Sequence, residues 1–156
     1  MIFQISSDPK VSLHIHIEGG NLLATRLFLS NSFEVIFTHE TSPALLNWLR
    51  LYAKKSPPLL PIPLSAQSPF STQVLTALQK VPFGHTLSYK SLALASNNPK
   101  ALRAIGGACH RNPFPLLIPC HRVIRSDGSL GGFALDLEIK KRLLHFEKKS
   151  RQERRL

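Results

Sequence analysis

The chain has 156 residues, of which 43% are hydrophobic, and it carries 20 lysines and arginines against 9 acidic residues. This length suits one domain, or one compact domain with a smaller partner, and the apolar fraction suffices for a core. Two cysteines are too few for a secreted disulfide framework, and without a CxxC or His-rich tract we expect no structural zinc site. We find neither a signal-peptide pattern nor an apolar run of membrane-spanning length, so we expect a soluble, cytoplasmic protein with no membrane partner.

The positive charge is distributed unevenly. Residues 1–69 hold 5 basic and 4 acidic residues, residues 70–147 hold 10 and 4, and residues 148–156 hold 5 and 1. A basic second half indicates an anionic partner such as nucleic acid, or only a basic soluble surface, and charge alone does not separate these readings. We interpret residues 150–156 as a solvated basic tail.

The first part of the chain predicts a small sheet followed by one helix. Alternating apolar and polar residues predict strands over 11–17, 22–29 and 33–37, with a turn at 18–21. Ser42 is placed to N-cap a helix that has Pro43 in its first turn and runs to about Lys54. Five prolines within residues 56–69 forbid a helix there. We therefore predict an α/β domain over 1–63 and a linker over 64–69.

From residue 70 the apolar spacing becomes helical, which predicts a second, mostly α-helical domain over 70–149. Helices are expected over 71–80, 87–95 (capped by Thr86 or Ser88) and from Pro99 to 108, and the last two with their tight turn are typical of a helix-turn-helix. A short buried strand is expected at Leu116–Ile118. A final helix, N-capped by Asp136, is expected from Leu137 to about Lys149.

The helix beginning near Pro99 has an unusual surface of small residues around one long cation, Arg103. Adjacent Gly106 and Gly107 weaken a helix by about 1 kcal/mol each relative to alanine. Either close packing against a neighbouring helix or entry of a smooth face into a narrow groove would offset this cost, and both interpretations stay open.

The residues with most chemical information are Pro119-Cys120-His121-Arg122-Val123. A thiol beside imidazole and guanidinium can be held partly as thiolate, the form that attacks carbon. Neighbours on a strand point to opposite faces, so a water bridge between Cys120 and His121 is easier to build than a direct contact. A histidine base needs an acid to hold its tautomer, and Glu147 on the last helix is the candidate. A purely structural histidine is the alternative.

These residues, preceded by Asn112-Pro113 and followed by a Gly-rich loop, resemble the O6-alkylguanine-DNA alkyltransferase family. The resemblance covers residues 70–147. It also rests on Val81-Pro82-Phe83-Gly84, Leu87-Ser88-Tyr89, the run from Ala101 to Ala108, and Leu143-Leu144-His145-Phe146-Glu147. It implies a ribonuclease-H-like α/β N-terminal domain and a mostly α-helical, winged-helix-like C-terminal domain with a helix-turn-helix.

The function implied by the resemblance is direct-reversal repair of double-stranded DNA containing O6-alkylguanine, and also O4-methylthymine. The lesion is flipped from the minor-groove side and its alkyl group, mainly methyl, moves irreversibly to Cys120. His121 acts through water with Glu147 behind it. No cofactor is implied, and each molecule reacts once. We expect a monomer, or several copies side by side on DNA.

The resemblance also implies roles for other residues. Tyr89 crowds the flipped nucleotide's phosphate and supports protonation of the leaving guanine, Arg103 fills the vacated stack, and Asn112 braces the active-site turn. Further expected DNA contacts are Ala101, Leu102, Ala104, Gly106, Arg111 and Arg122. The expected substrate pocket consists of Cys109, Val123, Phe133, Ala134, Leu135 and Lys140.

The sequence departs from the family pattern at two positions. Phe133 stands where the family usually has tyrosine, and Asp136 stands where it tends to have glycine, so the range of alkyl groups is open. One alternative function is a non-catalytic sensor of alkylated DNA, although such relatives lack the cysteine. Another is a cysteine hydrolase, which would need an oxyanion hole and leaves the basic helical part unexplained.

Overall fold

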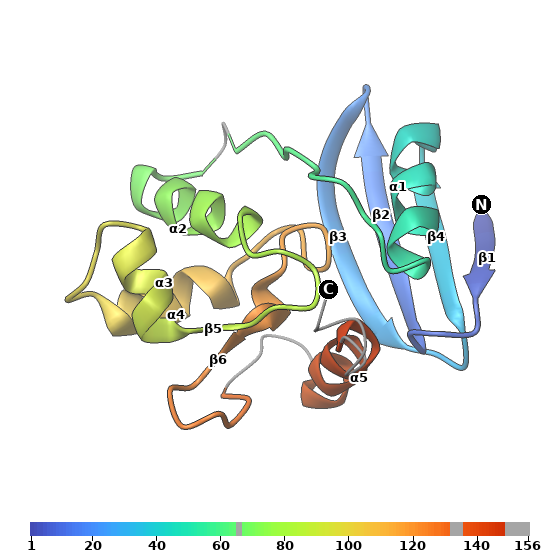
Figure 1. Ribbon diagram of the computed structural model, residues 1–156. Coiled ribbons are helices and arrows are strands. Elements are labelled where there is room, and N and C mark those ends of the chain that lie inside the picture. The colour runs from blue at the N-terminus through green and yellow to red at the C-terminus, as the bar shows by residue number, and fades with distance from the viewer. Residues whose placement is uncertain (65–66, 132–135, 149–156) are drawn as a thin grey trace.

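The computed structural model describes residues 1–64, 67–131 and 136–148, which form a sheet with one covering helix and a helical part (Figure 1). In chain order the elements are β1 (Ile2–Ser6), β2 (Val11–Glu18), β3 (Asn21–Leu29), β4 (Phe33–His39), α1 (Pro43–Ala53), α2 (Pro69–Gln79), β5 (Leu87–Ser88), α3 (Tyr89–Ala95), α4 (Leu102–His110), the 3-10 helix η1 (Cys120–Arg122), β6 (Val123–Ile124) and α5 (Leu137–Glu147).

The four-stranded sheet has the order β1-β4-β2-β3 and is mixed. β2 and β3 form the predicted antiparallel hairpin, β1 pairs antiparallel with β4, and β2 pairs in parallel with β4. Alternation along β2 explains its central place, because Val11, Leu13, Ile15 and Ile17 are all buried on one face of the sheet.

Helix α1 packs on this apolar face. Its predicted cap is present, since the Ser42 hydroxyl accepts a hydrogen bond from the Leu45 N–H at 3.2 Å, and Pro43 is the first helical residue. Trp48 and Tyr52 carry the buried side of the helix. The Tyr52 ring lies 5.9 Å from Phe33 of the sheet, between ring centroids, which brings α1 and β4 into one core.

The helical part consists of α2, α3 and α4 packed against one another, with a two-stranded parallel ladder of β5 and β6 beside them. Apolar residues at helical spacing, Val74, Leu75 and Leu78 of α2, are buried. Ser88 caps α3, one of the two predicted candidates, by accepting from the Ser91 N–H at 3.0 Å.

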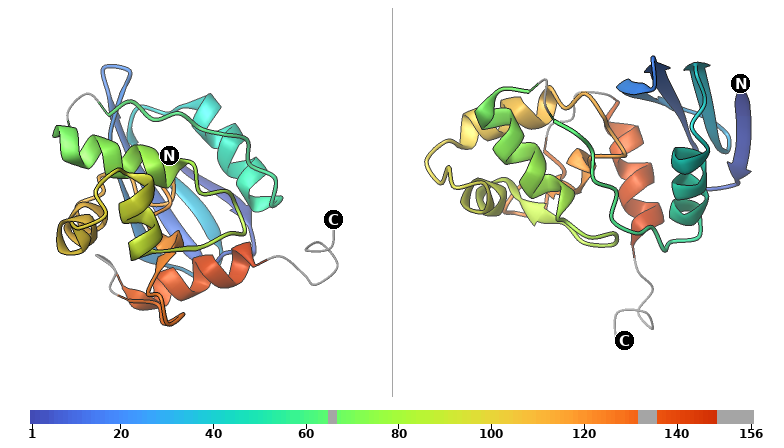
Figure 2. Two further views of the ribbon diagram at one scale, coloured as in Figure 1. Left: turned by 60° about the vertical axis from the view of Figure 1, so that its left-hand side comes forward. Right: turned by 90° about the horizontal axis from the view of Figure 1, so that it is seen from above.

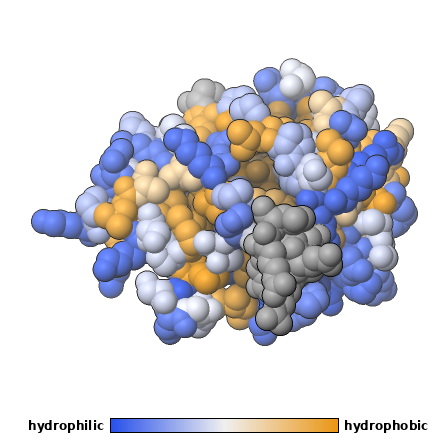
Figure 3. Space-filling view, viewed as in Figure 1, coloured by the Kyte–Doolittle hydropathy of each residue, from blue (hydrophilic) through white to orange (hydrophobic). Residues whose placement is uncertain are grey.

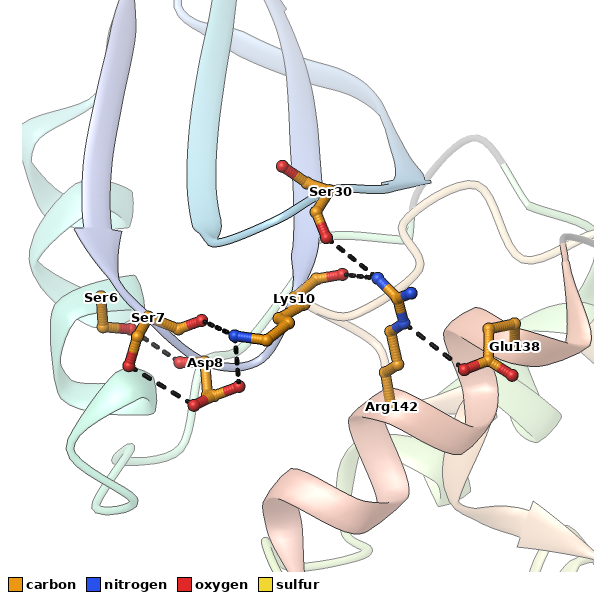
Figure 4. A network of polar contacts seen from close by, with 7 residues as sticks. All are labelled: Ser6, Ser7, Asp8, Lys10, Ser30, Glu138 and Arg142. Carbon is orange, nitrogen blue, oxygen red and sulfur yellow. Dashed lines mark hydrogen bonds and ion pairs between the residues drawn. The ribbon is translucent and has the colours of Figure 1, made fainter.

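Helix α5 connects the two parts, lying between the sheet and the remaining helices (Figures 1 and 2). Its N-cap is Asp136, as predicted, which accepts from the Glu138 N–H at 2.8 Å. Arg142 donates to the backbone carbonyls of Lys10, at 2.7 Å, and Ser30, at 2.9 Å, which lie beside the sheet strands (Figure 4). This contact fixes α5 against the sheet end of the molecule.

Four predicted elements differ from the structure in detail, and β1 was not predicted. The helix expected over 87–95 begins at Tyr89, because Leu87 and Ser88 form β5. Residues Leu116–Ile118 form no ladder strand; only an isolated bridge joins Pro115 to Ile118, and Leu116 has a left-handed φ of 73°. The helix expected from Pro99 begins at Leu102, because residues 97–100 form a turn. Helix α2 begins at Pro69 instead of 71, with Ser68 as its cap, so the predicted linker ends earlier.

The surface is polar at its edges. On the face shown in Figure 3, hydrophilic side chains follow the rim and hydrophobic ones gather toward the middle. Among the helices in the described ranges, none combines the length and apolar character needed to span a bilayer.

Candidate active site

The Cys120 thiol lies at the start of η1, on a buried turn that the Asn112 side chain braces. Asn112 Nδ2 donates to the Ile118 carbonyl at 2.9 Å, and its Oδ1 accepts from the Phe114 N–H at 3.0 Å. The Cys120 N–H also donates to the Ile118 carbonyl, at 2.8 Å, and this hydrogen bond closes the turn. These bonds satisfy a loop backbone that pairs with no strand ladder, and they explain how the turn tolerates the left-handed Leu116.

The same loop is anchored on the sheet. Thr25 of β3 donates from its N–H to the Pro113 carbonyl at 3.0 Å and from its hydroxyl to the Pro115 carbonyl at 2.8 Å. The N-terminal sheet therefore supports the turn on which Cys120 is carried.

The Glu147 carboxylate of α5 makes hydrogen bonds with three side chains. Its Oε2 lies 2.6 Å from His121 Nε2 and accepts from the Tyr52 hydroxyl at 2.5 Å, and its Oε1 accepts from Arg122 Nε at 2.7 Å. Burial by itself would raise the pKa of Glu147, but His121 and Arg122 together lower it to about 2. Glu147 is therefore a buried carboxylate at neutral pH.

This carboxylate determines the tautomer of His121. Burial lowers the pKa of His121 despite the opposing effect of Glu147, so the ring is neutral at pH 7. A neutral ring that faces a carboxylate through Nε2 carries its proton there, which leaves Nδ1 as the basic nitrogen. Nδ1 is buried and has no hydrogen-bond partner among the described residues. The pairing of His121 with Glu147 expected from the sequence is thus present.

The Cys120 thiol is protonated at neutral pH and must lose its proton before it can react. Burial raises the pKa of Cys120, while the Asn112 side chain and the Lys140 ammonium act in the opposite direction. Cys120 is 7% exposed. A thiol of this kind becomes a nucleophile only when a neighbouring base takes its proton.

Residues from three further elements surround the thiol. The parallel pairing of Leu87 with Val123 brings the start of α3, and so Tyr89, alongside the Cys120 turn. Burial and then the nearby Cys109 and Cys120 raise the pKa of Tyr89, so its phenol stays protonated. A Cβ added to Gly131 would lie 3.2 Å from Tyr89 Cε2, which places the loop after β6 directly against this ring.

Lys140 and Cys109 complete the surroundings. The Lys140 ammonium is buried and donates to the Val123 carbonyl at 2.7 Å and to the Leu130 carbonyl at 2.6 Å. Burial raises the pKa of Cys109 to about 12. Both cysteines are free thiols.

Helix α4 presents an exposed surface of the predicted kind. Leu102, Arg103 and Ala104 are exposed, and Ile105 and Ala108 are buried. A Cβ added to Gly106 would meet no atom within 4 Å, and one added to Gly107 would meet only the side chain of Arg111. Close packing against a neighbouring helix, one of the two explanations left open for these glycines, therefore does not apply.

Comparison with known proteins establishes the family to which the chain belongs. Residues 69–149, about half of the chain, match the family described as 6-O-methylguanine DNA methyltransferase, DNA binding domain. The chain belongs to this family. A constitutive methylated-DNA–protein-cysteine methyltransferase of Bacillus subtilis is 37% identical over 142 residues, covering 83% of this chain and 86% of that protein.

Other members extend the comparison. The mouse methylated-DNA–protein-cysteine methyltransferase is 47% identical over 95 residues, which cover 56% of this chain but only 45% of the mouse protein. The chain thus spans under half the length of this relative. The Mycobacterium tuberculosis OGT, solved in complex with DNA, superposes with a TM-score of 0.72 at 26% identity, covering 88% of this chain and 92% of that one.

One residue expected to contact DNA lies elsewhere. Arg122 is 6% exposed, and its guanidinium donates inside the protein, from Nε to Glu147 and from Nη1 to the Val81 carbonyl at 2.8 Å. We therefore correct its predicted role from DNA contact to holding the Glu147 carboxylate. Arg111, at the end of α4, is exposed, and Ala101 lies partly exposed before that helix.

Several predicted positions fall outside the described residues. These are the pocket residues Phe133, Ala134 and Leu135 and the basic tail, 150–156. Within the described part of the chain, the one group of three potential metal ligands is His16, Glu18 and His39, on the sheet and apart from the thiol site.

Sequence reasoning missed Tyr52 as a member of the site. It lies on α1, 95 positions before Glu147, and in the sequence it is simply one apolar-face position of a predicted helix. A tyrosine at a fully buried helix position needs a partner for its hydroxyl, and this was the only available signal.

Proposed function

We propose that the protein repairs DNA by transferring the alkyl group of O6-alkylguanine, mainly methyl, to its own Cys120. The observation that carries this proposal is the hydrogen bond from Glu147 to His121, which leaves the buried Nδ1 as the basic nitrogen of the residue that directly follows the buried Cys120. O4-methylthymine, which places an alkyl group on an equivalent exocyclic oxygen, is a second expected substrate.

The first step is deprotonation of the thiol. A water between Cys120 and His121 Nδ1 passes the proton to the imidazole, and Glu147 stabilises the imidazolium through Nε2–H. The Asn112 side chain and the Lys140 ammonium favour the thiolate as it forms, since both lower the pKa of Cys120.

The second step is displacement at carbon. The sulfur forms a bond to the alkyl carbon, the bond from that carbon to guanine O6 breaks, and its electron pair stays on the base. We assign the Tyr89 phenol, which is kept protonated by burial and by the nearby Cys109 and Cys120, the role of helping the departing guanine take up a proton. The products are unmodified guanine and an S-alkylcysteine. A thioether is stable, so each molecule acts once.

Access to the buried thiol requires the damaged nucleotide to leave the duplex. We assign α3 and α4 the role of a helix-turn-helix, with α4 as the helix that enters the groove. Its exposed Arg103 fills the vacated stack, and the open space at Gly106 allows the DNA backbone to approach closely. Flipping costs a few kcal/mol, which the inserted arginine and the pocket offset.

The partner is therefore double-stranded DNA that contains the lesion, bound by a monomer or by several copies side by side. We assign residues 1–63 to an N-terminal domain with a ribonuclease-H-like sheet, and residues 70–149 to the DNA-binding and alkyl-acceptor domain, with 64–69 between them. Because the acceptor must remain a free thiol, a reducing compartment such as the cytoplasm suits the reaction.

The test is the intact mass of the protein after incubation with a duplex containing one O6-methylguanine, followed by peptide mapping. We expect one added methylene per protein, located on the Cys120 peptide, and Cys120→Ala should gain no mass yet still bind the duplex. Tight binding by the unaltered protein without mass gain would favour the damage-sensor alternative. Neither binding nor mass gain, with turnover on an ester, would favour the cysteine hydrolase.

A further inference from the structure

Three potential metal ligands converge on the exposed face of the sheet, where β2 and β4 end. His16 and Glu18 are two residues apart on β2, so they share the face opposite to the buried Ile15 and Ile17. His39 is the last residue of β4. The two strands run parallel, so their ends meet at the same edge of the sheet (Figure 1).

The backbone of His39 turns its side chain toward the other two. In the ladder His39 is paired with Ile17, and a regular strand would direct both side chains to the buried face. His39 instead has a left-handed φ of 71°. Its ring stacks on that of His16, with centroids 4.7 Å apart and an interplanar angle of 21°. Histidine is one of the few side chains that adopt this conformation readily.

The distances between the ligand atoms suit a shared ion. Glu18 Oε1 lies 3.2 Å from His16 Nε2 and 3.6 Å from His39 Nε2, and all three atoms lie within 4.8 Å of one another. Zinc binds histidine nitrogen and carboxylate oxygen at about 2.0–2.2 Å, so two ligands of a tetrahedral zinc ion are about 3.3–3.6 Å apart.

The approach of His16 to Glu18 is not a hydrogen bond. Although the His16 side chain is 39% exposed, its Nε2 atom is covered, and no hydrogen-bond partner for it is found among the described residues. A nitrogen that is covered and has no hydrogen-bond partner beside a carboxylate would gain a partner from an ion bound by both groups.

Hydrogen bonds hold the backbone segments that carry the three ligands in place without an ion. Glu40, next to His39, accepts hydrogen bonds from the N–H groups of Gly19, at 2.6 Å, and Gly20, at 3.0 Å, in the turn that follows Glu18. The Glu40 N–H donates to the Ile17 carbonyl at 3.2 Å. Binding an ion therefore requires only small side-chain rotations, and little conformational entropy is lost.

We propose that His16, Glu18 and His39 form a binding site for a divalent transition-metal ion, Zn²⁺ being the natural occupant for two imidazoles and one carboxylate. A water would complete the coordination. The ion would link the end of β2 to the end of β4 and so stabilise the N-terminal sheet. The earlier expectation of no zinc ligands rested on local spacing, whereas His39 lies 21 positions after Glu18 and joins it only in the fold.

The test uses the full chain, freed of metal with a chelator and then titrated with Zn²⁺ against a chromophoric competitor. We expect one ion per protein at this site. Zinc at about 100-fold excess over its dissociation constant should raise the melting temperature by roughly 5–10 °C. Mg²⁺, which prefers oxygen ligands, should have no such effect.

Two variants and two controls separate this site from other binding. His39→Asn, which tolerates the left-handed backbone, and His16→Gln should each weaken Zn²⁺ binding by more than about 10-fold, the loss seen even for outer partners of a metal. His14→Gln, on the same strand face, and Cys120→Ala should bind as the unaltered protein does. Circular dichroism checks that each variant is folded. Absence of one-to-one binding, or undiminished binding by folded His39→Asn, would overturn the proposal.

Discussion

Replacing Tyr52 with phenylalanine tests whether the N-terminal part of the chain supports the reactive centre. The substitution removes only the hydroxyl that donates to Glu147 Oε2 at 2.5 Å. The ring contacts of Tyr52 with Trp48, at 5.8 Å, with Phe83, at 5.4 Å, and with Phe146, at 5.5 Å between centroids, do not involve that hydroxyl. The substitution therefore removes one buried hydrogen bond, which the Tyr52 hydroxyl donates to the charged Glu147 carboxylate, and leaves the ring in place.

The expected magnitude follows from the character of that bond. A hydrogen bond to a charged group contributes about 1.5–3 kcal/mol, and both partners here are buried, so water cannot replace the lost donor. Glu147 keeps His121 and Arg122, so it stays ionised at pH 7. We expect Tyr52→Phe to lower the free energy of unfolding by about 1.5–3 kcal/mol and to slow alkyl transfer less than Glu147→Gln does.

The pH dependence gives a second readout. The pKa of Glu147 is about 2 in the folded protein against an ordinary 4.5, so its contribution to stability is complete above pH 4.5 and is lost as the pH falls toward 2. Removing a donor raises this pKa. The difference in stability between Tyr52→Phe and the unaltered protein should therefore shrink as the pH falls through that range.

Urea unfolding, followed by far-UV circular dichroism and by the fluorescence of Trp48, measures both quantities. Trp48 is the single tryptophan of the chain. A double-mutant cycle of Tyr52→Phe with Glu147→Gln then reports the coupling between the two side chains. A coupling below about 0.5 kcal/mol, the usual deviation from additivity between independent sites, would refute the assignment of Tyr52 as a support of Glu147.

Further predictions concern the residues around the thiol and on α4. Arg103→Ala should slow repair of O6-methylguanine in duplex DNA while leaving the reaction with free O6-benzylguanine unchanged, as measured by single-turnover kinetics. Arg122→Met should cost about 3–5 kcal/mol in urea unfolding, because it leaves a buried carboxylate without its cation, and should not alter the salt dependence of DNA binding. Asn112→Ala should shift the reaction of Cys120 with iodoacetamide to higher pH, because it removes a hydrogen bond that favours the thiolate. Since burial lowers the pKa of His121, the rate of transfer should begin to fall only below pH 6.5.

Local signals in the sequence predicted much of the fold. The alternation over 11–17 and 22–29 gave the central hairpin, since strand periodicity and a Gly-Gly turn reinforce each other. Ser42 and Asp136 marked helix starts correctly, because a capping side chain acts within three residues of itself. The pairing of His121 with Glu147 also followed from sequence, once an acid was required for the histidine.

The features that sequence did not predict depend on contacts between distant segments. The apolar run at Leu116–Ile118 is buried as expected, but burial alone does not make a strand, and here Asn112 satisfies the backbone instead of a ladder. Arg122 was assigned to DNA because arginines are usually exposed. Its burial depends on Glu147 and on the Val81 carbonyl, which lies 41 positions away. No local pattern encodes such partners.

The two thiols show how neighbours select a nucleophile. Cys109 and Cys120 are both buried and both have raised pKa values, so neither is intrinsically reactive. Burial and the proximity of Cys120 raise the pKa of Cys109 to about 12, although Lys140 acts in the opposite direction. Lys140 lowers the pKa of both thiols, but the Asn112 side chain lowers that of Cys120, which also adjoins His121, the base that Glu147 orients. Alkylation should therefore fall on Cys120 alone, because selectivity comes from the groups placed around the sulfur.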